Sequence, residues 1–142
     1  MITRSLRSAK ITSRSRQKEY YSDFAMNFGL NPITGSLTRL TNEESVKQSI
    51  KNIVMTQQGE RYYSMLGSTL PRSLFDPMDT IMLGSIHSSI NEAIKNYESR
   101  AINVQINIRV SQDQSTYIVD ISFGLINIPT IVHTVSIVNR IR

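Results

Sequence analysis

The chain has 142 residues and a net charge of +5, it contains no cysteine, and 39% of its residues are hydrophobic. These values fit one globular domain with a modest core rather than a disordered chain. The lack of cysteine excludes disulfides and thiolate chemistry. No apolar run approaches the roughly 18 residues of a membrane span, and the basic N-terminus lacks the apolar stretch of a secretory signal, so we expect no membrane partner.

Basic charge is concentrated at the N-terminus. Six of the 16 lysine and arginine residues and none of the 11 acidic residues fall within residues 1–18. We predict that residues 1–22 form an extended basic arm in front of one domain at residues 23–142. The arm could bind nucleic acid, an anionic membrane or an acidic protein surface, or serve as a transit peptide. Its expected contact residues are Arg4, Arg7, Lys10, Arg14, Arg16 and Lys18.

Turn signals and a helix follow the arm. Asn-Pro at 31–32 and Thr-Gly at 34–35 predict turns. The apolar residues that we expect to anchor this segment on the domain are Phe24, Phe28 and Leu30.

The first helix begins at residues 41–44. Thr41 or Asn42 can cap it, the glutamates at 43 and 44 favour its positive end, and Gly59 would terminate it. Its apolar face at helical spacing consists of Val46, Ile50, Ile53 and Val54.

The segment at 60–77 is too broken by glycine and proline to form one element. We nevertheless expect it to be ordered, because its large side chains need burial: Tyr62, Tyr63, Met65, Leu66, Leu74 and Phe75. A second helix is predicted from its N-cap, Asp79, to Tyr97. Its apolar stripe consists of Met82, Ile86, Ile90, Ala93, Ile94 and Tyr97.

Three strands complete the chain. Apolar residues alternate with polar ones in "INVQINIRV" at 102–110 and "TYIVDISFGLI" at 116–126, and "TIVHTVSIVNRI" at 130–141 comes last. We therefore predict an α+β fold: two main helices packed on a small antiparallel three-stranded C-terminal sheet, with an extended basic N-terminal arm.

Few residues suit metal binding or covalent catalysis. The two histidines, His87 and His133, have no metal-ligand spacing, and the chain has no P-loop, no GxGxxG and no GxSxG motif. We expect no metal, no cofactor and no catalytic residue.

A glycosidase would need two carboxylates, one of them with a raised pKa. Glu60 and Glu98 could meet for this purpose. Each can instead pair with a nearby arginine, Arg61 or Arg100, which would lower the carboxylate pKa and is wrong for a general acid.

The last strand could bind another protein chain. A C-terminal strand at an open sheet edge presents unpaired main-chain groups, which can pair with a strand of another chain. Alternatively, Arg140 and Arg142 blunt the edge.

Four pieces of the sequence, in this order, resemble one known family. They are "TQQGERYYSMLGSTL" at 56–70, "LFDP" at 74–77, the helix ending in "NYESR" at 96–100, and the three strands. Together they resemble the baseplate wedge proteins of contractile phage tails, the sheath-initiator family shared with the type VI secretion baseplate. The resemblance covers about residues 23–142, and the arm matches nothing in it.

One departure from that family is informative. Its members carry Glu-Pro-Arg where this chain has Glu98, Ser99 and Arg100. Proline would fix φ and bias the glutamate towards an extended conformation, whereas serine does neither, so tertiary contacts must hold this break. We expect Arg100 to offset Glu98, whose charge opposes the helix macrodipole, while both stay available to a partner.

The resemblance implies a structural, non-enzymatic role in the tail baseplate of a virion that is assembled in the host cytoplasm. Its implied partners are baseplate wedge core proteins, the tail sheath protein, and tube or hub proteins through the arm. The implied wedge-core contacts are Glu98, Ser99, Arg100, Glu60 and Arg61. The implied strand-exchange residues are Val132, Thr134, Val135, Ser136, Ile137, Val138, Arg140 and Arg142.

Two alternatives remain at this point. Some family members are labelled lysozyme-like, so a peptidoglycan-cleaving enzyme that uses Glu98 or Glu60 is the first. The second is a nucleic-acid binder that acts through the arm, although the domain lacks a basic stripe with interleaved aromatic residues.

Overall fold

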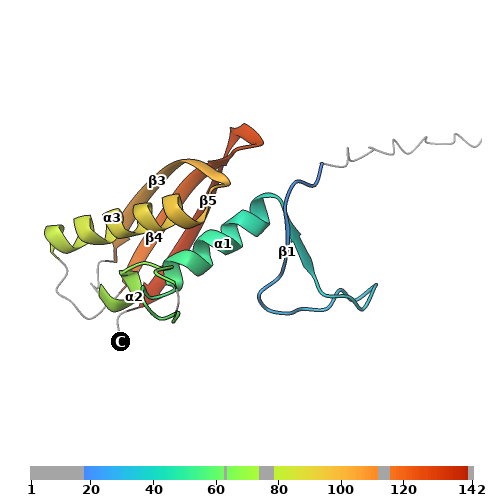
Figure 1. The fold of residues 1–142 in the computed structure, drawn as a ribbon, viewed down its shortest axis with the longest axis horizontal. Helices are drawn as coiled ribbons and strands as arrows, with labels where there is room; N and C mark the ends of the chain where they lie inside the picture. The colour runs from blue at the N-terminus through green and yellow to red at the C-terminus, as the bar shows by residue number, and fades with distance from the viewer. Residues whose placement is uncertain (1–17, 63, 74–78, 112–115, 141–142) are drawn as a thin grey trace, which may run out of the picture.

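The computed structural model describes residues 18–62, 64–73, 79–111 and 116–140. A three-stranded sheet lies at the C-terminal end, and helices cross one of its faces (Figure 1), which confirms the predicted α+β class. No helix within these ranges has the length and apolarity of a membrane span. The elements are β1 Ser22–Phe24, β2 Arg39–Thr41, α1 Glu43–Met55, α2 Leu70–Ser73, α3 Thr80–Tyr97, β3 Ala101–Val110, β4 Thr116–Leu125 and β5 Ile128–Arg140.

The C-terminal sheet is the predicted meander. Strand β4 lies in the centre and pairs antiparallel with β3 on one side and β5 on the other. Alternate residues of a strand share a face, and the helix-facing set on β4 is fully buried. This set, Tyr117, Val119, Ile121 and Phe123, joins the apolar faces of α1 and α3 in one core.

The start of α1 differs from its prediction. Asn42 is the N-cap residue with a φ of 48°, but its side chain makes no cap hydrogen bond, so this part of the prediction is wrong. Its side-chain oxygen accepts the N–H of Tyr20 at 2.8 Å, and its amide donates to the carbonyl of Lys18 at 3.1 Å. Asn42 therefore fastens the incoming chain to α1. The predicted apolar face is confirmed, since Val46, Ile50, Ile53 and Val54 are all buried.

Gly67 and Ser68, rather than Gly59, contact the C-terminal end of α1. Gly59 has a φ of 84° but lies beyond the helix end, so its prediction as the terminator is wrong. The Ser68 hydroxyl donates to the carbonyl of Val54 at 2.6 Å, and its N–H donates to that of Thr56 at 2.9 Å. A Cβ on Gly67, whose φ is 124°, would lie 2.4 Å from the Thr56 carbonyl oxygen, so glycine is required.

The segment after α1 is less buried than predicted. The side chains of Tyr62 and Met65 are exposed, so the expectation that they need burial is wrong for both. Leu70, in the short helix α2 that the sequence did not predict, is fully buried instead. The predictions for Tyr63, Leu74 and Phe75 lie outside the described residues.

Helix α3 largely follows its prediction. The carboxylate of Asp79 accepts the N–H of Met82 at 2.7 Å and so caps the helix as expected. The ring of Tyr97 is 41% exposed, so its place in the buried stripe is wrong. The buried stripe consists of Ile86, Ile90, Ala93 and Ile94.

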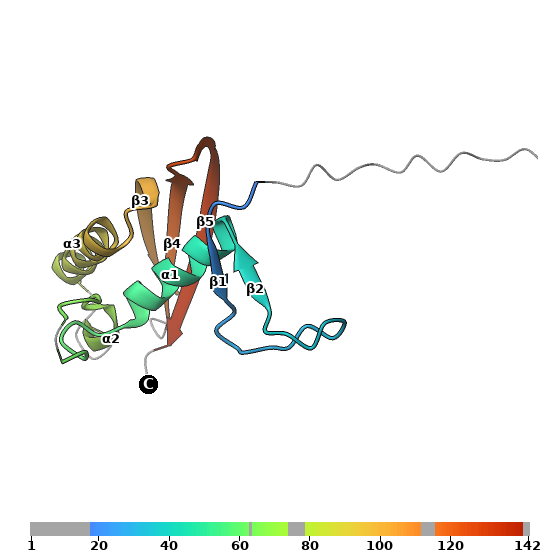
Figure 2. The ribbon, with the colours of Figure 1, turned by 45° about the vertical axis from the view of Figure 1, so that its right-hand side comes forward.

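A two-stranded hairpin, which the sequence did not predict, precedes α1. Strand β1 pairs antiparallel with β2, and the chain between them projects away from the body (Figure 2). We call residues 22–41 the N-terminal hairpin. The expectation that Phe24, Phe28 and Leu30 anchor it is wrong, because each of these side chains is more than half exposed.

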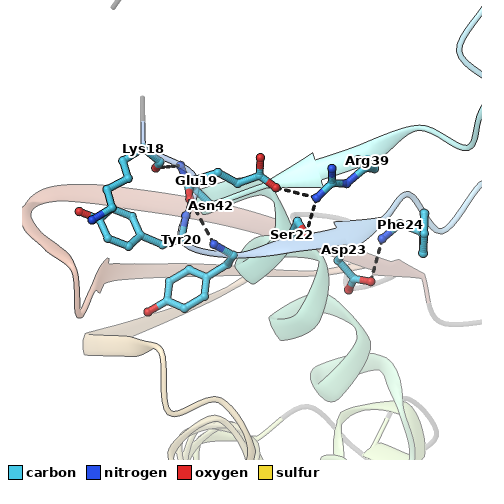
Figure 3. A network of polar contacts seen from close by, with 9 residues as sticks. Lys18, Glu19, Tyr20, Ser22, Asp23, Phe24, Arg39 and Asn42 are labelled. Atoms are coloured by element: carbon cyan, nitrogen blue, oxygen red, sulfur yellow. Dashed lines mark hydrogen bonds and ion pairs between the residues drawn. The ribbon is translucent and has the colours of Figure 1, made fainter. Parts of the chain in front are cut away.

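Polar contacts hold the N-terminal hairpin instead. The side chain of Gln48, on α1, accepts the N–H of Met26 at 2.9 Å and donates to the carbonyl of Phe24 at 2.8 Å. Figure 3 shows the Arg39 guanidinium donating to Glu19 at 2.7 Å and to the hydroxyl of Ser22 at 2.8 Å. The hairpin is thus attached to α1 and to the residues just before β1.

Candidate functional site

The junction between α3 and β3 is built on a buried ion pair. The side chain of Glu98 is 2% exposed, and the Arg100 guanidinium grips it at both oxygens, with Nε to Oε1 and Nη2 to Oε2 each at 2.6 Å. Such a two-point contact fixes geometry as well as charge. The expectation that Arg100 offsets Glu98 is confirmed, but the expectation that Glu98 also stays available to a partner is wrong, because its side chain is buried. The burial of Glu98 leaves Ser99 and Arg100, whose side chain is 30% exposed, to face outwards.

Contacts around the junction take the place of the proline that the resemblance implies. The N–H of Ala101 donates to the carbonyl of Glu98 at 3.2 Å and closes a tight turn around Ser99. Glu98 has a φ of −127° and a ψ of 76°, so its φ is one that a following proline would favour, whereas its ψ lies below the extended range of about 120–160°. The ion pair and this turn together hold the break between helix and strand.

The electrostatics of Glu98 oppose a role as general acid. Burial alone would raise the pKa of Glu98. Hydrogen bonds from Arg100 and from Ser49 on α1, together with the charge of Arg100, outweigh this effect of burial. They hold the pKa of Glu98 below its ordinary value of 4.5. A general acid needs a raised pKa, so this carboxylate is set for an ion pair.

Tyr21 extends the junction to distant parts of the chain, and sequence reasoning missed it. The Arg100 guanidinium lies over the Tyr21 ring, 5.4 Å from its centroid. The Tyr21 hydroxyl accepts a hydrogen bond from the side chain of Asn127, in the β4–β5 turn, at 2.6 Å, and its carbonyl accepts the N–H of Asn42 at 2.8 Å. The only sequence signal was an aromatic residue beside the arm.

Glu60 and Arg61 are exposed and lie apart from this junction. Glu98 contacts Ser49 in the middle of α1, whereas Glu60 lies in the turn beyond the C-terminal end of that helix. The six residues from Ser49 to that end alone span about 9 Å. The carboxylate of Glu60 accepts the N–H of Gln57 at 3.2 Å, so its predicted pairing with Arg61 is replaced by a local turn contact.

A cavity of about 490 Å³ in the described chain offers no acid pair. It lies between α3 and the segment after α1, and Glu92 is its one lining carboxylate. Within the described ranges no three potential metal-ligating side chains cluster. His87 is exposed on α3, and the His133 ring lies 5.9 Å from the ring of Phe123.

The outer edge of β5 presents unpaired main-chain groups. The N–H of Ser111, the residue directly after β3, donates to the Thr116 carbonyl at 2.9 Å, so the main-chain groups of Thr116 point towards the β3 side of β4. In a strand, the N–H and C=O groups of successive residues point to opposite neighbouring strands. The main-chain groups of Tyr117 and of every second residue after it therefore pair with β5. Their β5 partners include His133, Val135 and Ile137. The N–H and C=O groups of the alternate β5 residues point away from β4, and no described strand covers this edge. These residues are Val132, Thr134, Ser136 and Val138.

The two faces of β5 differ in character. On the helix-facing side Ile137 is buried and Val135 is half-buried. On the other side the Ser136 hydroxyl donates to Asp120 at 2.6 Å, and Arg109 of β3 also donates to Asp120, which together lower the Asp120 pKa. The predicted exchange residues that are exposed on this side are Val132, Thr134, Ser136, Val138 and Arg140. Arg142 lies outside the described residues.

Only one predicted arm contact falls in the described chain. The Lys18 side chain is exposed and its Nζ lies 5.2 Å from the ring centroid of Tyr20. The remaining five, Arg4, Arg7, Lys10, Arg14 and Arg16, lie outside the described residues.

The fold and the site define a class: a small α+β protein with an ion-paired helix-to-strand junction and a free strand edge. The chain belongs to the family of baseplate wedge protein gp25, whose model matches residues 40–130. It is 30% identical over 94 residues to the baseplate wedge protein gp25 of Enterobacteria phage T4, a match that covers 66% of this chain and 71% of that protein.

Solved structures share the fold. A crystal structure from Geobacter sulfurreducens, described as a candidate tail lysozyme, aligns with a TM-score of 0.62 at 22% identity and covers 70% of this chain and 91% of that one. A chain of the cryo-EM structure of the anti-feeding prophage baseplate aligns with a TM-score of 0.57 at 21% identity and covers 86% of each chain. At these identities the likeness concerns the fold alone.

Proposed function

We propose that this protein is a structural component of a baseplate wedge in a contractile phage tail, where it docks on the wedge core and templates the sheath by strand addition. Family membership supports a place in the tail baseplate of a virion. We further propose that the virion is assembled in the host cytoplasm. The observation that carries the templating step is the row of main-chain groups pointing outwards from β5. An added strand would take its affinity from these groups.

Strand β5 is better suited to this task than β3, the other edge of the sheet. β5 pairs with β4 without interruption from Val132 to Arg140. The register of β3 shifts between Ile102 and Gln105, where Asn103 has a φ of 52°. Such a bulge disturbs the regular ladder that an incoming strand needs and protects an edge from pairing.

The ion-paired junction is the proposed wedge-core contact. Ser99 and the outer part of Arg100 would meet the partner, while Glu98 would hold Arg100 in position from beneath. Glu60 and Arg61 would form a separate contact at the far end of α1. The basic arm would add contacts to tube or hub proteins.

A proline test isolates the templating step. Ser136→Pro removes one outward N–H, and because Ser136 does not use its N–H towards β4, the internal ladder is spared. Ser136→Ala is the matched control, since both variants lose the hydrogen bond to Asp120. In particles assembled with each variant and viewed by electron microscopy, we expect sheaths with alanine and bare baseplates with proline. Normal sheaths on the proline variant would refute strand addition at β5.

A peptidoglycan-cleaving enzyme is the second candidate, favoured by the fold shared with the candidate tail lysozyme. The lowered pKa of Glu98 and its grip by Arg100 oppose it. Incubating purified cell walls with the protein and with Glu98→Gln decides between the two. We expect no sugar fragments from either sample, and release that depends on Glu98 would establish the enzyme.

A further inference from the structure

A groove of about 300 Å³ opens beside the free edge of β5, on the helix-facing side of the sheet. Three elements of the chain form it: the N-terminal hairpin, α1 and β5. Its apolar lining comes from Met26, Leu40 and Val135. Its polar lining comes from Glu44, Lys47, Gln48 and Lys51.

The hairpin wall of the groove is fixed in place. Gln48 binds the main chain of the hairpin at two points, the Met26 N–H and the Phe24 carbonyl. The position of Met26 relative to α1 is therefore set before any partner arrives, and a preformed wall lowers the ordering cost of binding.

The charge of the groove is positive. Lys47 lies 2.7 Å from Glu44 in an ion pair, whereas Lys51 has no ion pair in the described part of the chain. A cationic side chain that entered the groove would face this lysine, and like charges brought together without water repel each other. The groove therefore suits an apolar side chain and disfavours lysine or arginine.

The register of an added strand aims one side chain at this groove. A residue that pairs directly opposite Val135 has its side chain on the same face of the sheet as Val135. That face carries the groove, whose lining includes Val135 itself. We infer that the groove is a specificity pocket for one aliphatic side chain of the incoming strand, at the position opposite Val135. This inference rests on the proposed strand addition at β5.

The test is a titration of the full chain with short synthetic peptides, followed by NMR. The probes are nine-residue threonine peptides whose central residue is leucine, lysine or threonine, so that leucine is the only apolar residue that can set the register. Binding is measured as slowed exchange of the outward amides of Val132, Thr134, Ser136 and Val138. We expect the leucine peptide to bind at least tenfold more tightly than the threonine peptide, and the lysine peptide to bind most weakly.

Two protein variants then locate the preference. Met26→Lys places a charge on the hairpin wall and should abolish the advantage of leucine. Met65→Lys is the matched control. Met65 is 66% exposed, close to the 63% of Met26, but it lines the cavity of about 490 Å³ beside α3 instead of this groove. The control should keep the advantage of leucine.

The outcomes separate the two levels of the proposal. Equal slowing of the outward amides by all three peptides would keep strand addition and overturn the pocket. Slowing by none of them would overturn both. Loss of the leucine preference in both methionine variants would also overturn the pocket, because the effect would then not depend on the groove.

Discussion

The body of the protein buries its large apolar side chains, whereas the N-terminal hairpin exposes them. In the body, α1 and α3 close over β4, and side chains such as Ile90 and Phe123 are fully buried. In the hairpin, Phe28 is 71% exposed and Ile33 is 92% exposed, while side-chain hydrogen bonds such as those of Gln48 attach the strands to α1. Hydrophobic burial therefore stabilises the body, whereas a few polar contacts position the hairpin.

Removing one large apolar side chain from each region should affect stability very differently in the body and in the hairpin. Ile90→Ala should lower the free energy of unfolding by about 3–4 kcal/mol, because it leaves a cavity in the core. Phe28→Ala should change it by less than about 0.5 kcal/mol. Urea denaturation measures both. A large loss for Phe28→Ala would show that the hairpin has its own apolar packing.

Two glycines with positive φ give the next largest contrast. Gly67→Ala in the body should cost about 2–3 kcal/mol, because the new Cβ would clash with the Thr56 carbonyl at a strained φ. Gly35→Ala, in the hairpin, meets no atom within 4 Å and should cost about 1 kcal/mol from backbone strain alone. Thermal denaturation compares the two, and equal losses would contradict the close approach at Gly67.

The ion pair at Glu98 lies in the body, beside Tyr21 at the entrance to the hairpin. Glu98→Gln should lower stability by about 2 kcal/mol at pH 7, since it weakens charged hydrogen bonds to Arg100. The pKa of Glu98 is lowered on folding, so its contribution is complete above about 4.5 and is lost as pH falls through the folded value. The difference between wild type and variant should therefore shrink in acid, as urea denaturation from pH 7 to pH 3 would show.

The control for this pH dependence is the exposed Glu60. Glu60→Gln should change stability by less than about 0.5 kcal/mol at both ends of the pH range. If Glu98→Gln kept its full effect at pH 3, the carboxylate would not act through its charge.

The side chain of Gln48 tests the polar attachment of the hairpin to α1. Gln48→Ala removes both side-chain contacts to the hairpin and should lower global stability by about 1 kcal/mol or less. Hydrogen exchange at the Met26 amide should nevertheless rise several-fold, because its hydrogen-bond acceptor is gone. Lys51→Ala, on the same helix, should leave this exchange unchanged. Unchanged exchange in the glutamine variant would mean that other contacts hold the hairpin.

The body was predictable from the sequence because its signals are periodic. Alternation in β3 and β4 and the helical spacing of Val46, Ile50 and Val54 both record a buried face, and the structure confirms them. The hairpin was not predictable, since its strands have three residues each and its position depends on Gln48, 22 and 24 residues away from its partners.

In the candidate site, too, local contacts could be predicted from the sequence and long-range contacts could not. The pairing of Glu98 with Arg100 is local and followed from their spacing. The part played by Tyr21 depends on partners brought from α1 and from the β4–β5 turn, which no local pattern records. The residue type of Asn42 predicts a helix cap, but its side chain binds the main chain of the incoming segment instead.

The hydrogen bond between Tyr21 and Asn127 has a consequence for the order of folding. Its partners lie 106 residues apart, so the bond closes a loop that contains all the helices of the described chain and two of the three strands of the C-terminal sheet. Closing such a loop costs entropy that only an already folded interior can limit. During synthesis the N-terminal segment emerges first, yet the hydrogen bond between Tyr21 and Asn127 can form only after the β4–β5 turn exists. This bond therefore requires both ends of the domain to be in place, whereas the contacts of the same segment with Asn42 do not.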